Sequence, residues 1–391
     1  MTRQQNSTAL ADVLKYVAEA GFDGLASAIE ILLNEAMKLE RDAFLHAGWH
    51  ERTEERRGYA NGYKDKTVKS RLGALQLAVP QVRDVKDGAG FYPQALERGE
   101  RSERALKLAL AEMYVQGVST RKVAAITEQL CGLDISSAAV SRAAAALDEQ
   151  LEAWRTRELA PLEYLVLDAM YEKVRHGGRV VSQATLIAIG IDANGRRSIL
   201  GVSVSLSEAE VHWRDFLSSL RARGVCGLHM IVSDSHEGLK AACTAVFPGV
   251  AWQRCQVHLQ RNAAGYVPRI EMRKTIAREL RDVFHAPSRV EAERLLGLMV
   301  ERHRETAPRL ADWLEDAVPD GFAVFALPVA HHRRLRSTNL IESINSQVRR
   351  RTRVAGLFPN EPSLLRLVSA VLMEISEEWE TGRRYLPQGD G

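Results

Sequence analysis

The chain has little that would tie it to a membrane or to an oxidising compartment. Its 391 residues include only four cysteines, at irregular spacings that do not form a disulfide framework. We therefore expect a cytoplasmic protein in a reducing environment. The polar N-terminus has no apolar signal core, and no run of about 18 apolar residues could form a membrane-spanning helix. No membrane partner is expected.

The chain also lacks a large excess of charge of one sign. It has 53 Lys and Arg against 50 Asp and Glu, a net charge of +3. The distribution is more informative, because the window from His331 to Arg353 holds seven arginines and one acid, Glu342. Such an imbalance favours nucleic-acid phosphate as a partner. The stretch from Glu51 to Arg71 holds seven basic and four acidic residues, which fits either phosphate contacts or a solvated loop.

The length predicts two to three domains. Residues 9–48 have apolar residues at helical spacing, and residues 75–80 alternate like a short strand that ends at Pro80. Helical patterns return over residues 101–154. Residues 261–330 are again helical, with Trp313 as either a core residue or a stacking partner for a DNA base.

Two short helices separated by a break with Gly132 are expected between residues 119 and 151. This pattern fits a helix-turn-helix, although helical hairpins are also common in proteins that do not bind DNA. In the DNA-binding interpretation, the second helix would enter the major groove. The candidate DNA contacts are Arg121, Lys122, Ser141 and Arg142, with Ser137 beside them.

Strand patterns dominate the centre of the chain. Residues 164–167, 183–191 and 198–204 are expected to form an antiparallel meander, with a hairpin turn at 192–195. A helix over 212–223 leads to further strands at 229–233 and 251–258. The order of elements predicts a mixed sheet in an α/β domain.

Two carboxylates stand directly after expected strands and a third lies on a later helix: Asp168, Asp234 and Glu342. If they converge at one edge of the sheet, their charges would repel one another unless cations are bound. Mg²⁺ prefers such hard oxygen ligands. Two ions about 3.5–4 Å apart can activate water or a 3′-hydroxyl for phosphodiester cleavage. The arginines around Glu342 would then bring DNA to the metals.

Each carboxylate also has a local explanation. Asp168 can hydrogen-bond the turn after its strand. Asp234 with Glu237, and Asn339 with Glu342, fit the spacing of a helix capping box. The residues alone leave both interpretations open.

Cys255-x-x-His258 has the spacing of a zinc ligand pair. A structural zinc ion needs four ligands, and no second pair stands nearby. We therefore expect no zinc, and a buried thiol with a hydrogen-bonded histidine instead.

Several motifs in fixed order resemble the bacterial Mutator-type family of insertion-sequence transposases. They are Leu167-Asp168-Ala169, Val232-Ser233-Asp234-Ser235-His236-Glu237-Gly238-Leu239, Trp252-Gln253-Arg254-Cys255-Gln256-Val257-His258, Asn339-Leu340-Ile341-Glu342-Ser343-Ile344-Asn345, residues 349–359 and 383–386, and upstream residues 58–63 and 117–121. The resemblance covers nearly the whole chain.

The resemblance implies an Asp-Asp-Glu transposase with a ribonuclease-H-like core. Asp168, Asp234 and Glu342 match its catalytic, metal-binding carboxylates, served by Mg²⁺ or Mn²⁺, with two ions expected. Cys255 and His258 match a supporting Cys/Asp-x-x-His signature. Expected partners are the terminal inverted repeats of the element, target DNA and a second copy in a homodimer. Further DNA contacts are expected from the late arginines Arg333, Arg334, Arg349, Arg350, Arg351 and Arg353.

The expected domains follow from this resemblance. Residues 1–100 form a helical and basic region and 101–155 a helix-turn-helix segment, both for DNA binding. Residues 156–260 and 331–391 form the two parts of an α/β catalytic core with a mixed sheet, and an all-α insertion occupies 261–330. Two alternatives are a non-catalytic DNA-binding protein and a general metal-dependent nuclease. The intact carboxylates disfavour the first, and the separate helix-turn-helix disfavours the second.

Overall fold

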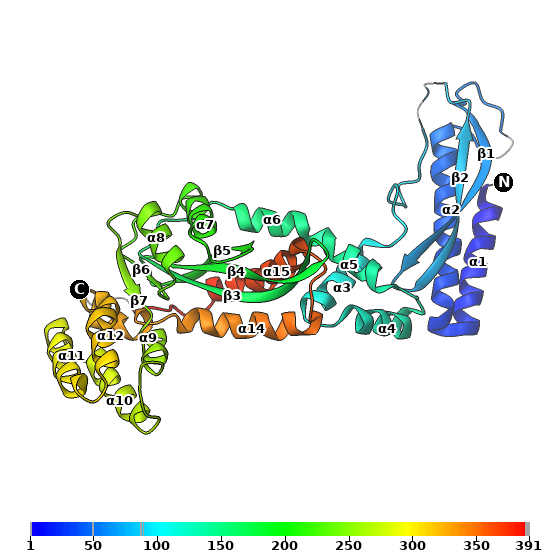
Figure 1. Cartoon of the computed structure of the whole chain (residues 1–391). Coiled ribbons are helices and arrows are strands. Elements are labelled where there is room, and N and C mark those ends of the chain that lie inside the picture. Colours follow the sequence, from blue (N-terminus) through cyan, green and yellow to red (C-terminus); the bar gives the residue numbers. More distant parts are fainter. Residues whose placement is uncertain (1, 49–50, 87, 89, 388–391) are drawn as a thin grey trace. The chain divides into compact units, whose positions relative to one another are not determined.

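The computed structural model describes residues 2–48, 51–86, 88 and 90–387, and the side chains from residue 9 onward. Its internal contacts divide the chain into two compact units (Figure 1). The first comprises Met1–Tyr114 and Val118–Ala146. The second comprises Val115–Gly117 and Leu147–Gly391.

The first unit begins with a pair of helices. The single helical stretch expected over 9–48 is divided into α1 (Thr2–Ala20), a short 3₁₀ helix (Gly21–Gly24) and α2 (Leu25–Leu45). A Cβ atom on Gly24 would lie 2.4 Å from the backbone oxygen of Tyr16, so only glycine allows the chain to turn so closely here.

A two-stranded antiparallel hairpin packs on α2. Its strands are β1 (Tyr59–Ser70) and β2 (Gly73–Arg83). The basic stretch treated as a loop in the sequence is thus largely a strand, and the strand expected to end at Pro80 continues to Arg83. A proline is tolerated there because each strand of a two-stranded sheet has one open edge. Leu75, Leu77 and Val79 pack against Met37 of α2.

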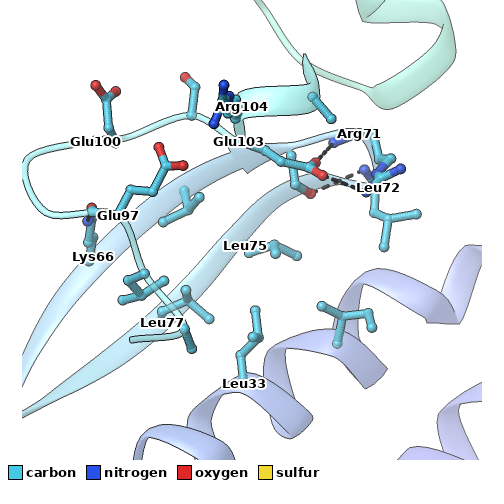
Figure 2. Close-up of a pocket in the computed structure, with 17 residues that line it drawn as sticks. Leu33, Lys66, Arg71, Leu72, Leu75, Leu77, Glu97, Glu100, Glu103 and Arg104 are labelled. Carbon is cyan, nitrogen blue, oxygen red and sulfur yellow. Dashed lines mark hydrogen bonds and ion pairs between the residues drawn. The ribbon is translucent and has the colours of Figure 1, made fainter. Parts of the chain in front are cut away.

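A cavity of about 460 Å³ lies beside this hairpin (Figure 2). Apolar side chains such as Leu33, Leu75 and Leu77 line it together with charged residues. Among the latter, Arg71 Nη2 lies 2.8 Å from Glu103 Oε1. None of the catalytic candidates lines this cavity, so it is separate from the chemistry expected of the chain.

Three helices follow the hairpin: α3 (Arg104–Val115), α4 (Thr120–Cys131) and α5 (Ser137–Ala144). The Ser119 side chain caps α4 by accepting a hydrogen bond from the Lys122 amide, and Gly132 ends it with a positive φ of 63°. Leu106, Leu110, Val123, Leu133 and Val140 form a shared core. The two helices and their break occur as predicted. The second was expected to reach residue 151 but ends at Ala144, before a 3₁₀ turn (Ala145–Leu147) and α6 (Asp148–Thr156).

The second unit is built on a five-stranded mixed sheet. Its strands are β3 (Tyr164–His176), β4 (Arg179–Ile191), β5 (Arg197–Ser205), β6 (Met230–Ser233) and β7 (Ala251–Arg254). The spatial order is β5-β4-β3-β6-β7. Strands β3, β4 and β5 pair antiparallel, and β6 and β7 add to β3 in parallel. The predicted meander and mixed sheet are confirmed.

Helices cover both faces of this sheet (Figure 1). On one face, α7 (Glu210–Ala222) and α8 (Glu237–Val246) bury Trp213 and Leu239 against sheet residues that include Leu165 and Leu167. On the other, α14 (Asn339–Ala355) contacts β3, and α15 (Glu361–Thr381) contacts β5 and α6. Alternate residues of the buried strands therefore serve two different cores.

A helical segment joins β7 to α14. It contains α9 (Gln256–Ala263), α10 (Met272–Phe284), α11 (Arg289–Arg304), α12 (Pro308–Ala317), two 3₁₀ helices (Val318–Gly321 and Ala323–Ala326) and α13 (Val329–Leu335). The expectation that residues 261–330 are helical is confirmed. The segment has its own apolar core, and Trp313 stacks on Tyr266 beside it, with ring centroids 5.1 Å apart.

The Gln253 side chain anchors this segment to the sheet. Its Nε2 donates to the Gly321 oxygen at 2.9 Å, and its Oε1 accepts from the Val324 amide at 2.7 Å. Within the described ranges, no helix combines the length and apolar character needed to cross a bilayer.

Candidate active site

Asp168 lies inside β3 and not at its end. The strand was expected to stop at Leu167 but runs on to His176. The decisive boundary is the end of its pairing with β6, which covers only Tyr164 to Val166. Asp168 is thus two residues beyond the last pair, and Asp234 comes directly after β6. Both carboxylates lie at the same edge because the parallel neighbour stops there.

Asp168 is buried and strongly affected by its surroundings. Its exposed fraction is 8%. Burial, and then the charge of Asp234, raise the pKa of Asp168 to about 7. Asp168 Oδ2 accepts a hydrogen bond from Asn345 Nδ2 at 2.9 Å. The two aspartates therefore form a pair of like charges in a water-poor environment.

Asp234 and Glu342 are not used as helix caps. His236 is the N-cap of α8, and Asp234 Oδ1 accepts from the His236 amide at 3.2 Å. Thr338, not Asn339, is the N-cap of α14, and no side chain caps that helix. The capping-box interpretations are therefore wrong, and both carboxylates are left for other interactions.

Cys255 connects the two later carboxylates through its backbone and sulfur. The strand expected over 251–258 ends at Arg254, so Cys255 begins α9. Its amide donates to the Ser233 oxygen at 2.7 Å, next to Asp234. Its buried Sγ accepts from both the amide and the hydroxyl of Thr338, each at 3.3 Å. Burial opposes thiol ionisation, but the neighbouring His258 and Thr338 outweigh it and lower the pKa of Cys255.

His258 lies among the three carboxylates. The Cys255 sulfur, despite the opposing effect of burial, raises the pKa of His258, and the charges of Asp168 and Asp234 raise it further. Its Nε2 is 3.8 Å from Glu342 Oε1. Glu342 also forms an ion pair with Arg261 of α9, with 2.8 Å between Nη1 and Oε1. The structure thus brings Asp168, Asp234 and Glu342 around one imidazole, as the convergence argument predicted.

The oxygen donors suit a hard cation. Among the described residues, no three or more His, Cys, Asp and Glu side chains form a group arranged to hold a metal ion. Mg²⁺, however, is usually held by only one or two carboxylates, with water and substrate phosphate completing the shell. Asp168 and Asp234 fit this pattern because a bound cation would offset the repulsion of two like charges.

Comparison with known proteins places the whole chain in one family. The model described as "Transposase, Mutator family" matches residues 1–382. The chain belongs to the Mutator family of transposases. It is 56% identical over 370 residues to the transposase for insertion sequence element IS406 of Burkholderia multivorans, covering 94% of each chain.

Other members of the Mutator family match over similar lengths. The transposase for insertion sequence element ISRM5 of Rhizobium meliloti is 44% identical, covering 100% of this chain and 97% of its own. The transposase for insertion sequence element IS256 in transposon Tn4001 of Staphylococcus aureus is 37% identical, covering 91% of each.

In this Mutator-family chain, the residues expected to contact DNA fall into two groups. Most are exposed: Arg121 and Lys122 on α4, Ser141 and Arg142 on α5, Arg333 on α13, and Arg349, Arg350 and Arg353 on α14. Arg334 is exposed but stacks on the Tyr385 ring at 5.0 Å. The half-buried Arg351 donates to the Val115 oxygen and Gln116 Oε1 at 3.0 and 2.7 Å.

Three residues at the site escaped the sequence reasoning: Arg261, Thr338 and Asn345. Asn345 was grouped with the polar, outward face of its helix, yet it is buried beside Asp168. Its position one helical turn after Glu342 was the available signal, since residues three apart on a helix are neighbours. Nothing in the sequence pattern indicated Thr338 or Arg261, because both contacts depend on elements distant in the chain.

Proposed function

We propose that the chain is a metal-dependent DNA transposase that binds the terminal inverted repeats of an insertion sequence, cleaves there and joins 3′-hydroxyls to target DNA. The observation that carries the proposal is the convergence of Asp168, Asp234 and Glu342 around His258 in a chain of this family. The catalytic core is ribonuclease-H-like in this proposal. The sheet order, with three antiparallel strands extended by two parallel ones, supports that assignment.

The residues at the edge of the sheet divide the work. Asp168 and Asp234 would hold Mg²⁺ or Mn²⁺, and Glu342 would complete the carboxylate set. When bound, such ions supply Lewis-acid stabilisation of the phosphodiester and activate the attacking oxygen. The paired aspartates provide the negative charge that attracts the ion. Cys255 and Thr338 fix the start of α14, and thereby the helix that carries Glu342.

The exposed basic residues would hold the DNA. Arg349, Arg350 and Arg353 lie on the helix that carries Glu342, where phosphate contacts would bring a strand to the carboxylates. The α4–α5 pair of the first unit would read element ends as a helix-turn-helix, with Arg142 on its second helix. A homodimer would serve the pairing of two ends.

The proposal is tested with supercoiled DNA carrying both element ends, incubated with Mg²⁺ and mapped at nucleotide level. We expect cleavage at the element ends and joining to target DNA by the unmodified protein. Asp168→Asn, Asp234→Asn and Glu342→Gln should each abolish both steps while end binding is retained. Full cleavage by all three variants would refute the assignment of the carboxylates.

The same assay separates the alternatives. Binding to the ends without any cut would identify a non-catalytic DNA-binding protein. Cuts distributed without regard to the element ends would identify a general nuclease.

A further inference from the structure

Asn345 links the glutamate helix directly to the first aspartate. It lies three residues after Glu342 on α14 and is 177 residues from Asp168 in the chain. Its side-chain Nδ2 donates to Asp168 Oδ2 at 2.9 Å, and only 7% of the residue is exposed. A buried hydrogen bond to a carboxylate restricts where that carboxylate can lie. Asn345 therefore fixes the position of Asp168 relative to the helix that carries Glu342.

The other end of this amide has no partner. Asn345 Oδ1 is a buried oxygen without a hydrogen bond among the described residues. Exchanging the amide oxygen and nitrogen would not satisfy it, because an oxygen would then face the ionised Asp168 oxygen. An unsatisfied buried acceptor costs about 1–3 kcal/mol, so its presence beside a carboxylate calls for an explanation.

We propose that Asn345 is a positioning residue for the divalent cation: Nδ2 holds the Asp168 carboxylate while Oδ1 supplies an oxygen to the hydrated ion. This inference rests on the proposed metal-dependent function. Amide oxygens belong to the hard ligands that bind such cations directly or through their water molecules. The unpaired oxygen and the like-charged aspartates would then be satisfied by the same ion.

The arrangement also differs from an ordinary helix-packing contact. An amide that served only to dock α14 on β3 would be satisfied at both ends, as Gln253 is in the same unit. Asn345 is satisfied on the side of Asp168 alone. Its position at one helical turn from Glu342 places it between the two metal-binding candidates that are most distant in the chain.

The test measures binding of Mn²⁺ to the DNA-free protein by electron paramagnetic resonance, together with thermal unfolding. Asn345→Leu has a similar volume but neither donates nor accepts, and should weaken Mn²⁺ binding about 10–100-fold, the usual cost of losing a supporting group at a metal site. Asn345→Asp keeps an oxygen and adds a charge. It should lower the metal-free melting temperature by repulsion of Asp168 and bind Mn²⁺ at least as tightly as the unmodified protein.

Gln347→Leu is the matched control, because Gln347 is an exposed amide on the same helix. It should leave Mn²⁺ binding unchanged. The inference is overturned if Asn345→Leu and Asn345→Asp both lower the melting temperature while Mn²⁺ affinity stays at the unmodified value. If Asn345→Leu fails to fold, the Asn345→Asp arm alone decides.

Asp168→Asn separates this inference from the proposed function. Loss of Mn²⁺ binding and of cleavage in Asp168→Asn, with normal Mn²⁺ binding in both Asn345 variants, would refute only the role of Asn345. Retained Mn²⁺ binding and cleavage in Asp168→Asn would refute the proposed metal site itself.

Discussion

The two units place their polar residues in opposite ways. In the second unit, functional candidates are held by buried contacts: Asp168 by Asn345, and Cys255 by Thr338. In the first unit, the candidates for DNA contact on α4 and α5 lie on the surface, as Arg142 does. Catalysis requires fixed geometry, whereas phosphate contacts require donors that a large ligand can reach.

This difference predicts different responses to mutation. A change in the buried network of the second unit should alter chemistry and stability together. A change on the surface of the first unit should alter affinity and its salt dependence, with little effect on folding. The experiments below test this contrast, from the largest expected effect to the smallest.

The largest effect is expected for catalysis by Asp168→Asn. A bound ion contributes several kcal/mol of transition-state stabilisation, and about 4 kcal/mol corresponds to about 10³-fold in rate. Cleavage at element ends should therefore fall by about that factor or more, while affinity for end DNA, measured by gel shift without metal, is retained. An equal loss of DNA affinity would break the contrast between the units.

The same variant should be more stable than the unmodified protein when metal is absent. The pKa of Asp168 is raised from 3.8 to about 7, so between these values the folded state holds a proton that the unfolded state has lost. Stability therefore falls as pH rises through this window, and the cost is fully present above pH 7. At about 1.4 kcal/mol per unit, the cost reaches about 4 kcal/mol.

Urea unfolding in the presence of a chelator measures this cost. Asp168→Asn should gain up to that amount over the unmodified protein at pH 8 and almost none at pH 4. A difference that is independent of pH would show that the Asp168 charge is not the cause.

Thr338→Val should remove one of the two hydrogen bonds to the Cys255 sulfur with little change in volume. We expect a loss of about 1 kcal/mol in the free energy of unfolding and slower cleavage at unchanged DNA affinity. Thr338→Ser keeps the hydroxyl and should restore cleavage toward the unmodified rate. Equal cleavage rates for the two variants would show that the contact does not position Glu342.

Arg142→Ala in the first unit should weaken binding to end DNA by about tenfold at low salt. The slope of log K against log salt should become less steep by about 0.9, as for the loss of one phosphate contact. Arg351→Ala is the contrasting control, because Arg351 bonds the Val115 oxygen and Gln116. It should reduce thermal stability and leave the salt slope of end binding nearly unchanged.

The smallest effect is expected for the stability of Arg261→Ala. Its ion pair with Glu342 is 60% exposed on the arginine side and 30% on the glutamate side. Such pairs contribute about 0–1 kcal/mol. Chemical unfolding should therefore change by less than about 1 kcal/mol. A larger loss would mean that the surface of the second unit is as tightly coupled as its interior.

Much of the fold followed from local pattern in the sequence. The meander of β3, β4 and β5 and the turn at 192–195 are strongly periodic segments with clear turn residues. The helices of residues 261–330 were recognised for the same reason. The strand β1 was missed because its charged side chains hide the alternation, and its partner β2 defines it only after folding.

The site was predictable in its residues but not in its contacts. Asp168 and Asp234 were found through the apolar runs before them, although β3 continues past Asp168. The capping interpretations failed because His236 and Thr338 occupy the N-cap positions. Asn345 was misjudged because a polar residue on an amphipathic helix is usually exposed, and only the packing of α14 on β3 buries it.

The anchor at Gln253 has a consequence for how the chain can vary in length. Its amide is satisfied at both ends by backbone groups at Gly321 and Val324, so the helical segment is fastened where it returns toward the sheet. The connection between α10 and α11, at residues 285–288, is distant in sequence from this fastening and carries mostly exposed residues. Insertions should be tolerated there and not near Gly321, which makes that connection the natural position for a fused tag or an added domain.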